Sequence, residues 1–423
     1  MSSEWQQLTL DQIKSPTKSA FSMGPFGSRI KAENFVSSGV PVIKGRNLNG
    51  DLNRSSFDFL TSEKAAELST SIARRLDLVI THRGTLGQVG IIPPDSRHPE
   101  YIVSQSQLKL SFDQTKANPY YIYYFLRSPV GQRCLLANTS QVGVPAIAHA
   151  LTSVRYIRVP LPPLGIQDSI VGILRLLDDR IALLRETNAT LEAIAQALFK
   201  SWFVDFDPVR AKQEGREPEG MDADTAALFS DSFEESELGL VPKGWRVGKV
   251  EDLLVLAYGK ALKASERLSG TIPVYGSGGI TGCHNEPLVN GPSIVVGRKG
   301  TVGSLYWIDQ PFYPIDTVFY VKANVPLSYC YYQLALLGLE GMNTDAAVPG
   351  LNRNNVYRLS VVIPFNSVIE KFDSFVTLLR RRIFSNVVQS QTLASIRDTL
   401  LPRLISGQLR LPEAEAIIEE ATA

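Results

Sequence analysis

The amino-acid sequence predicts an α+β protein in which two β-rich globular domains are each followed by a long helix. Three observations support this prediction: the chain is too long for one core, it repeats itself, and its clearest repeat has helical periodicity. A chain of 423 residues favours two to four domains. Its 44% hydrophobic and 20% charged residues are typical of a soluble globular protein.

The repeated helical segments are residues 166–199 and 368–401, which align without a gap at an offset of 202. Their apolar residues are spaced mostly by three and four, as on one face of a helix. Each segment would span ~50 Å as a helix. A helix of that length with a narrow apolar stripe needs a partner helix to cover the stripe. We therefore predict an antiparallel coiled coil with pseudo-two-fold symmetry. The matched positions are Ile166, Ile170, Ile173, Leu177, Ile181, Leu191, Ile194 and Leu198, against Val368, Phe372, Phe375, Leu379, Ile383, Leu393, Ile396 and Leu400.

Polar residues also fall on this predicted seam. Asn188 and Ser390 occupy equivalent positions in the two segments. A polar seam residue can fix the register of a coiled coil. The alternative is that both residues lie exposed at a point where the pair frays.

The segments that precede the helices are rich in short β-type runs separated by Gly and Pro, which predicts β-rich domains. They match each other at drifting offsets, as expected for loop insertions within a common fold. "VPAI" (144–147) matches "VPGL" (348–351), and "NPYYIYYFL" (118–126) matches "PLSYCYYQL" (326–334). The predicted order is domain 1–160, helix 161–204, linker 205–240, domain 241–364, helix 365–410 and tail 411–423.

Charge is distributed unevenly along the chain. Residues 1–165 carry 18 basic and 11 acidic side chains (net +7), and residues 241–366 carry 11 and 8 (net +3). Residues 205–240 carry 3 basic and 11 acidic side chains (net −8), with Pro and Gly punctuation, so we expect much of this linker to be extended or mobile. The basic regions are compatible with a polyanionic partner, and equally with ordinary variation in charge.

A basic glycine loop occurs twice. Residues 81–87 read "THRGTLG" and residues 297–303 read "GRKGTVG", and each follows an apolar β-type run. The glycine permits positive φ and a close backbone approach, while the adjacent basic residues could reach phosphates or the edge of guanine. The alternative is a hairpin turn with solvated charges, which a shared fold would also duplicate.

Several further loops place Gly, Asn, Gln, Arg or Lys near predicted strand edges, a chemistry suited to contacts with bases and phosphates. Each of these loops could also be ordinary surface. The candidate DNA-binding residues are Arg29, Lys31, Lys44, Arg46, His82, Arg83, Gly84, Gln105, Gln107, Arg298, Lys299, Gly300, Asn352 and Arg353.

Sequence signatures of catalysis and metal binding are missing. Neither a phosphate-binding GxxxxGK[ST] loop nor a GxSxG nucleophile elbow occurs, and "GSGGITG" (276–282) has Thr281 at the third-glycine position, which predicts a turn. The four histidines and three cysteines show no metal-ligand spacing, and the cysteines fit a reducing cytoplasm. No apolar run reaches the ~18 residues of a membrane span, and the N-terminus lacks a secretion signal. These features favour a non-catalytic binding protein.

Four longer segments carry a resemblance to a known family. They read "VPLPPLGIQDSIVGILRLLDDRIALL" (159–184), "ALFKSWFVDFDPV" (197–209), "LGLVPKGWRV" (238–247) and "LLPRLISGQLRL" (400–411). Together with the two glycine loops, they resemble the specificity subunits of type I restriction-modification systems over nearly the whole chain. The chain departs from the family where Ile166 replaces a common Glu, and where "IPFNSVIEKF" loses most of the helix-start motif.

The resemblance implies a cytoplasmic subunit whose two target-recognition domains each read one half of a split, asymmetric double-stranded DNA sequence. It implies that the paired helices act as a ruler and bind two methyltransferase subunits, with restriction (motor-nuclease) subunits completing the assembly. S-adenosylmethionine, ATP and Mg would belong to those partners, and no cofactor to this chain. The readings left open are a protein-interaction scaffold, an enzyme acting on nucleotides through the glycine loops, and a subunit that serves methylation only.

Overall fold

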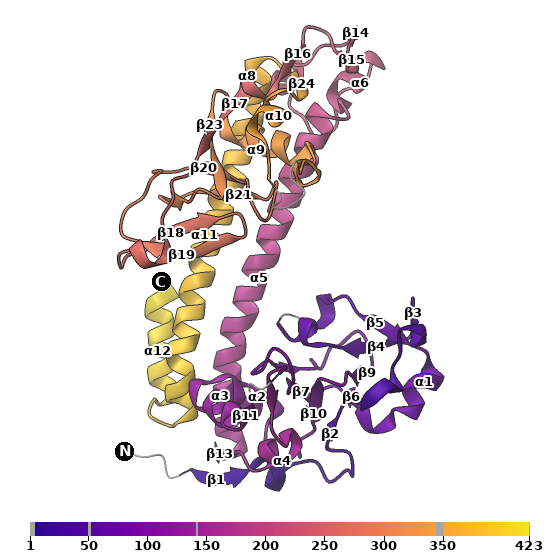
Figure 1. The fold of residues 1–423 in the computed structure, drawn as a ribbon, viewed down its shortest axis with the longest axis vertical. Coiled ribbons are helices and arrows are strands. Elements are labelled where there is room, and N and C mark those ends of the chain that lie inside the picture. Colours follow the sequence, from indigo (N-terminus) through magenta and orange to yellow (C-terminus); the bar gives the residue numbers. More distant parts are fainter. Residues whose placement is uncertain (1–4, 50–51, 141–142, 344–349, 423) are drawn as a thin grey trace. The chain divides into compact units, whose positions relative to one another are not determined.

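The computed structural model describes residues 5–49, 52–140, 143–343 and 350–422. Two compact units make up the chain, one of residues 1–183 with 389–423 and the other of residues 184–388. Each unit holds one β-rich domain and portions of two long helices, and Figure 1 shows both helices as continuous coils. The predicted α+β class is confirmed.

Two sheets form the β-rich domain of the first unit. The four-stranded sheet is antiparallel, with the order β2 (Phe21–Met23), β10 (Gln107–Leu110), β7 (Leu78–Thr81) and β8 (Val89–Ile91). The other sheet has the order β3 (Phe35–Val36), β5 (Asp58–Leu60), β4 (Val40–Ile43), β9 (Glu100–Val103) and β6 (Ile72–Arg74). Two strand pairs and four helices complete the domain: β1 (Gln6–Thr9) with β13 (Arg158–Leu161), β11 (Thr139–Ser140) with β12 (Ala146–Ile147), α1 (Ser62–Glu67), α2 (Pro119–Arg127), α3 (Pro129–Leu136) and α4 (Ala150–Arg155).

The second unit contains a β-rich domain of similar design. Its four-stranded sheet has the order β17 (Leu254–Tyr258), β23 (Val318–Ala323), β20 (Ser293–Gly297) and β21 (Leu305–Ile308). Its three-stranded sheet has the order β19 (Gly279–His284), β18 (Ile272–Gly276) and β22 (Tyr313–Pro314). The remaining elements are β14 (Phe233–Ser236) with β15 (Gly239–Pro242), β16 (Arg246–Lys249) with β24 (Ser360–Ile363), α6 (Asp207–Gln213), α7 (Ala223–Ala227), α8 (Val250–Leu253), α9 (Leu327–Leu336) and α10 (Arg353–Tyr357).

The internal repeat in the sequence is a repeat of topology. The order β2-β10-β7-β8 in the first unit corresponds to β17-β23-β20-β21 in the second, and all neighbours in both sheets are antiparallel. The pair β1–β13 corresponds to β16–β24, since each joins the start of a domain to the strand before its long helix. The two glycine loops lie in matched hairpins, β7–β8 and β20–β21.

The two long helices are α5 (Leu164–Phe203) and α11 (Asn366–Ile405), with 40 residues each. At 1.5 Å per residue each is ~60 Å long. Within the second unit, Asn386 donates to Asn188 over 2.8 Å and Arg380 pairs with Glu192 over 2.8 Å. From Asn188 to Glu192 the residue number rises along α5, while that of the partner on α11 falls from 386 to 380. The helices therefore pair antiparallel there, as predicted. Asn188 thus forms a polar seam contact, although its direct partner is Asn386.

The predicted seam is correct at most positions and wrong at three, the first of which is Ile166, 37% exposed near the start of α5. Buried residues include Ile170, Leu177, Ile181, Val368, Phe372, Leu393 and Leu400. Ile194 and Phe375, however, are 49% and 39% exposed, while the next residues, Ala195 and Val376, are at most 1% exposed. Neighbouring helical positions differ by about 100° in direction. Matching the larger apolar residue therefore selected the wrong one of two adjacent positions.

The acidic linker, much of which was expected to be extended or mobile, contains regular secondary structure. Residues 205–240 contain α6, α7 and the first strand of the β14–β15 hairpin. Phe206 and Phe229 are buried against Trp245, with ring centroids 5.7 and 6.4 Å apart, and Phe229 also meets Trp202 at 5.1 Å. Burying a large aromatic side chain contributes roughly 1.5–3 kcal/mol. The net charge of the segment was a poor guide to its structure, because its few aromatic residues determine its packing.

The C-terminal segment also has structure that the sequence analysis did not assign. Gly407, with φ of +71°, follows the end of α11, and the chain continues into α12 (Leu411–Thr422). Leu404, Leu409 and Ala414 are at most 5% exposed, so this turn is packed. The tail after the second long helix is therefore a helix over most of its length.

Candidate nucleic-acid interface

The glycine loops have the same backbone shape in both domains. Gly84 and Gly300 have φ of +94° and +87°, and Gly87 and Gly303 have φ of +83° and +73°. Glycine enters this left-handed region without the steric cost that other residues meet. The repeated Gly-Thr-x-Gly pattern is therefore explained first by a turn that both hairpins share. For Gly84 and Gly300 this turn geometry is the role that the structure supports directly.

A second segment holds the base of each loop. In the first domain the His82 carbonyl accepts a hydrogen bond from the Ile147 amide over 2.9 Å. In the second, the Arg298 carbonyl accepts one from the Leu351 amide over 2.8 Å. These donors belong to the matched "VPAI" and "VPGL" segments, of which residues 348–349 lie outside the described residues. The glycine loops and the "VPAI"/"VPGL" segments, which repeat at different offsets along the sequence, are therefore neighbours in each domain.

The first basic residue of each loop is directed inward. His82 is 7% exposed, and its Nε2 donates to the Gln105 carbonyl over 3.1 Å. Burial lowers the pKa of His82, and the nearby charge of Arg83 lowers it further. Arg298 donates from Nε and Nη2 to the Asp316 carbonyl over 3.0 and 2.5 Å. Both side chains thus hold a backbone carbonyl of their own domain.

The second basic residue of each loop is exposed. Within the described parts of the chain, the side chains of Arg83 and Lys299 make no hydrogen bond or ion pair. Their backbones are held by isolated bridges to Ala146 and Gly350, respectively. The side chains are therefore available to a ligand while the loop beneath them is fixed.

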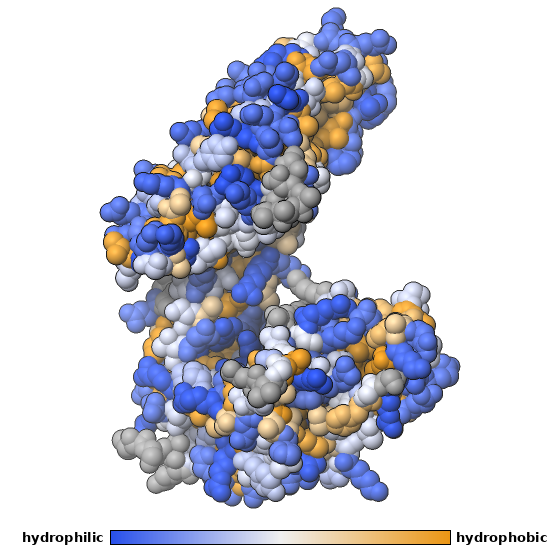
Figure 2. Space-filling model, in the orientation of Figure 1, coloured by the Kyte–Doolittle hydropathy of each residue, from blue (hydrophilic) through white to orange (hydrophobic). Residues whose placement is uncertain are grey.

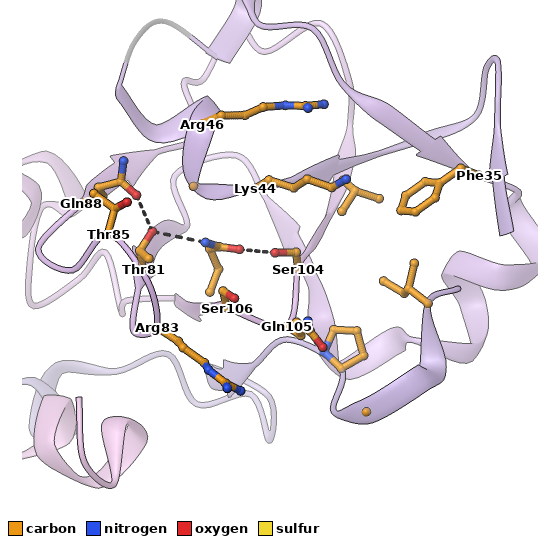
Figure 3. A pocket seen from close by; sticks show the side chains of 16 residues that line it. Phe35, Lys44, Arg46, Thr81, Arg83, Thr85, Gln88, Ser104, Gln105 and Ser106 are labelled. Carbon is orange, nitrogen blue, oxygen red and sulfur yellow. Dashed lines mark hydrogen bonds between the residues drawn. The ribbon is translucent and has the colours of Figure 1, made fainter. Parts of the chain in front are cut away.

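A pocket of about 600 Å³ opens beside the first loop and gathers five of the predicted residues. Polar and basic side chains share its wall with apolar ones, and Figure 3 shows Arg46 and Arg83 reaching across different sides of it. The lining residues are Pro25, Gly27, Ile30, Phe35, Val42, Lys44, Gly45, Arg46, Thr81, Arg83, Thr85, Gln88, Ser104, Gln105, Ser106 and Gln107.

A chain of hydrogen bonds crosses the floor of this pocket. Thr81 Oγ1 donates to Gln88 Oε1 over 2.9 Å and accepts from Gln107 Nε2 over 3.2 Å, while Ser104 donates to Gln107. Figure 3 shows this chain running from Gln88 through Thr81 to Ser104. Gln107 is 1% exposed and both ends of its amide are used, so it supports the floor rather than facing a ligand. A Cβ on Gly45 would lie 2.9 Å from Gln88 Oε1, so a side chain there would displace the Gln88 amide from this chain of hydrogen bonds.

Two of the predicted cations share one carboxylate. Lys44 and Arg46 lie 2.6 and 2.8 Å from the same Asp58 oxygen. The hydrogen bond from Lys44 holds the pKa of Asp58 below its usual value, with the charge of Arg46 adding to the effect. Lys44 also lies 4.7 Å from the centre of the Phe35 ring. This wall of the pocket therefore carries two positive charges against one negative charge.

The other candidates in the first domain, Arg29 and Lys31, are exposed and make few contacts with the rest of the domain. Arg29 ends the short turn Gly27–Arg29 and is exposed, next to pocket-lining Ile30. Lys31 is exposed and lies 3.5 Å from Glu33. Exposed pairs of this kind contribute about 0–1 kcal/mol, so Lys31 can exchange partners at little cost.

In the second domain, Asn352 and Arg353 have local roles. The Asn352 side chain accepts from the Asn354 amide over 2.9 Å and caps α10. The Arg353 guanidinium lies 5.0 Å from the Tyr258 ring and 5.6 Å from the Tyr357 ring. The sequence did not indicate that these two side chains support their own domain.

The "GSGGITG" segment is a turn, as predicted. It joins β18 to β19, and Gly279 has φ of +101°. The Ser277 carbonyl accepts hydrogen bonds from Ser304 Oγ and Tyr306 Oη over 2.6 and 3.2 Å. Since Ser304 follows the second glycine loop directly, the turn packs against the base of that loop.

Several pocket residues were missed from the sequence. Thr81 and Ser104 line the pocket and Asp58 pairs with its lysine and arginine, yet the three are distant from one another along the chain and no spacing connects them. Gln88 follows the first glycine loop at once, a signal that could have been used. Among the described residues, no group of three or more His, Cys, Asp or Glu could hold a metal ion, and no helix there could cross a membrane.

Comparison with known proteins decides the family. Residues 23–193 and 242–392 each match the family described as "Type I restriction modification DNA specificity domain". The chain belongs to this family. The two matches, one per β-rich domain with part of the helix that follows, agree with the internal repeat.

Curated type I specificity subunits resemble the chain over most of their length. The HindI specificity subunit of Haemophilus influenzae is 27% identical over 324 residues, covering 61% of this chain and 70% of its own. The MjaIX specificity subunit of Methanocaldococcus jannaschii is 22% identical over 380 residues, covering 84% and 82%. The crystal structure of the S subunit from M. genitalium has the same fold, with a TM-score of 0.58 at 17% identity and coverage of 95% and 96%.

The family assignment confirms the central prediction from the sequence. The chain is a specificity subunit of a type I restriction-modification system with two target-recognition domains, and its role in that system is recognition rather than catalysis. The glycine loops accordingly belong to recognition domains, and the reading of the chain as a nucleotide-processing enzyme is set aside.

Proposed function

We propose that this specificity subunit reads an asymmetric, two-part target in double-stranded DNA, one half with each β-rich domain. The observation that carries the proposal is that the two β-rich domains share one backbone framework and present different side chains on it. The four-stranded sheets and glycine turns match, while the exposed basic residue is Arg83 in one loop and Lys299 in the other. The same backbone presenting different hydrogen-bonding groups should select different bases.

The helices supply the second part of the proposal. Two continuous 40-residue helices, paired antiparallel, are suited to set the spacing between the half-sites. Apolar residues remain exposed on them, including Leu176 (64%), Leu183 (51%) and Leu378 (63%). On the face drawn in Figure 2, hydrophobic residues are interspersed among broader hydrophilic regions. Exposed apolar residues on paired helices suit the docking of partner proteins.

In the complete assembly, two methyltransferase subunits would bind this chain, and restriction subunits would join them in the cytoplasm. S-adenosylmethionine, ATP and Mg would act in those partners. The DNA affinity should come largely from phosphate neutralisation by basic side chains, and should therefore fall steeply with salt.

Mapping methylated adenines across the genome of cells that carry the complete system tests the proposal. The expected result is one motif of two unlike half-sites separated by a spacer of constant length. Exchanging residues 1–155 for the equivalent domain of a relative should change one half-site and leave the other unchanged. A single continuous motif, or a change in both half-sites after the exchange, would contradict independent reading by two domains.

A further inference from the structure

Resting on the proposed function, we infer that the two basic residues of each glycine loop have divided roles. Arg83 and Lys299 contact DNA, whereas His82 and Arg298 are positioning residues that hold the loops in place. The division follows from contacts that the two domains make independently, with different side chains, at matched positions.

The first step is the correspondence between the loops. At the offset of 216 residues, His82 corresponds to Arg298 and Arg83 corresponds to Lys299. The two loops follow the matched strands β7 and β20, and each lies beside the segment that leads into the neighbouring strand of the sheet, β10 or β23. Corresponding side chains can therefore be compared directly.

The second step is a two-point clamp that occurs in both domains. In the first, the His82 amide donates to the Ser106 carbonyl over 2.9 Å while its ring donates to the preceding carbonyl, that of Gln105. In the second, the Arg298 amide donates to the Thr317 carbonyl over 2.9 Å while its guanidinium donates to the preceding carbonyl, that of Asp316.

An imidazole and a guanidinium thus make the same contact on two consecutive carbonyls. Residues that read different bases need not converge in this way, whereas residues that hold the same loop must. The shared clamp therefore indicates a structural requirement of the fold.

The third step concerns the surroundings of the His82 and Arg298 side chains. His82 is buried, and its lowered pKa keeps it neutral at pH 7, so it offers no charge to a phosphate. The Arg298 guanidinium is held between a carbonyl and aromatic rings, 5.4 Å from the centre of Tyr258 and 5.9 Å from that of Phe319. The hydrogen bonds of both side chains are therefore made within their own domain.

The last step is the position of the proposed contact residues. Arg83 and Lys299 are exposed, directly before the positive-φ glycine, on loops fixed from beneath. Arg83 also lines the 600 Å³ pocket with Gln105, whose carbonyl the His82 clamp holds. Arg can bond a guanine edge or a phosphate through two parallel hydrogen bonds, whereas Lys acts as a point charge. We therefore expect Arg83 to influence base choice more than Lys299.

Substitution by glutamine separates the two roles, because it removes a charge and keeps an N–H donor. The assay measures the affinity of the complete methyltransferase complex for its mapped target across a salt series. Arg83→Gln and Lys299→Gln should each weaken binding about tenfold or more, and should reduce the log–log salt slope by about one if the contact is a phosphate. Relaxed base choice in the matching half-site would mark a base contact.

His82→Gln and Arg298→Gln are the matched controls. They should leave the salt slope unchanged and keep most of the affinity, whereas His82→Ala and Arg298→Ala should lose more because no donor remains. The inference is overturned if Arg298→Gln reduces the slope as Lys299→Gln does, or if Arg83→Gln and Lys299→Gln change neither affinity nor specificity. Failure of the unsubstituted complex to prefer its target over a scrambled duplex would instead refute the proposed function.

Discussion

Removing the Asp178 carboxylate should destabilise the first unit by about 2–3 kcal/mol. Asp178, on α5, accepts from the Tyr124 hydroxyl over 2.8 Å and from Arg397 of α11 over 2.6 Å. Tyr124 is 3% exposed, so Asp178→Ala would leave its hydroxyl buried without a partner, at a cost of about 1–3 kcal/mol. The ion pair is partly exposed, at 19% and 26%, and Arg397 keeps Asp398, so its loss adds only ~1 kcal/mol.

Calorimetry combined with hydrogen exchange is the suitable assay, because the chain has two compact units and hydrogen exchange reports on each of them. For a unit of this size the loss corresponds to a fall of about 5–10 °C in its Tm. Exchange should quicken in α2, which carries Tyr124, and in the adjoining turn of α5. Asp178→Asn, which retains an acceptor oxygen, should lose only ~1 kcal/mol. Equal losses for the two variants would refute the claim that the Tyr124 hydroxyl carries most of the effect.

The second unit supplies an internal control with reversed charge. Arg380 of α11 occupies the position that corresponds to Asp178 of α5, and it donates to Tyr332, the counterpart of Tyr124, over 2.8 Å. Its ionic partner is Glu192, on the opposite helix. Glu192→Ala should therefore quicken exchange in α9 and leave α2 unchanged.

Three further predictions follow from the helices and from His82. Replacing both Asn188 and Asn386 by Leu should raise the free energy of unfolding by ~1 kcal/mol or more in urea titrations, because Asn386 is 1% exposed and its Oδ1 has no hydrogen-bond partner among the described residues. A decrease would show that the polar pair stabilises the seam. Because the folded-state pKa of His82 is lowered, its contribution to stability is complete above the unfolded pKa of ~6.5 and declines as the pH falls below that value. Unfolding measured between pH 7 and pH 5 should show this decline, and His82→Gln should reduce it. Inserting four residues into both α5 and α11 adds ~6 Å to each, so the preferred DNA spacer should grow by about one to two base pairs with the half-sites unchanged; altered half-sites in methylation mapping would contradict the ruler.

Patterns local to the sequence were sufficient for the architecture. Constant-offset repeats with three- and four-residue spacing predicted both long helices, and the drifting offsets before them predicted two domains of one fold. The positive φ of Gly84 and Gly300 follows from the same kind of reasoning, since a glycine repeated at a hairpin tip usually meets a backbone requirement. Such features depend on neighbours along the chain, which the sequence displays directly.

Side-chain direction and partnership required the tertiary structure. Spacing could not distinguish His82, buried on the Gln105 carbonyl, from exposed Arg83, because adjacent residues differ only in the direction their side chains take. The Asp58 carboxylate and the Gln107 amide acquire their roles from residues far away in sequence. Packing free energy is likewise summed over contacts between residues that are distant in sequence. Such contacts bury the aromatic residues of the acidic segment, and they place Ala195, rather than Ile194, in the seam between the helices.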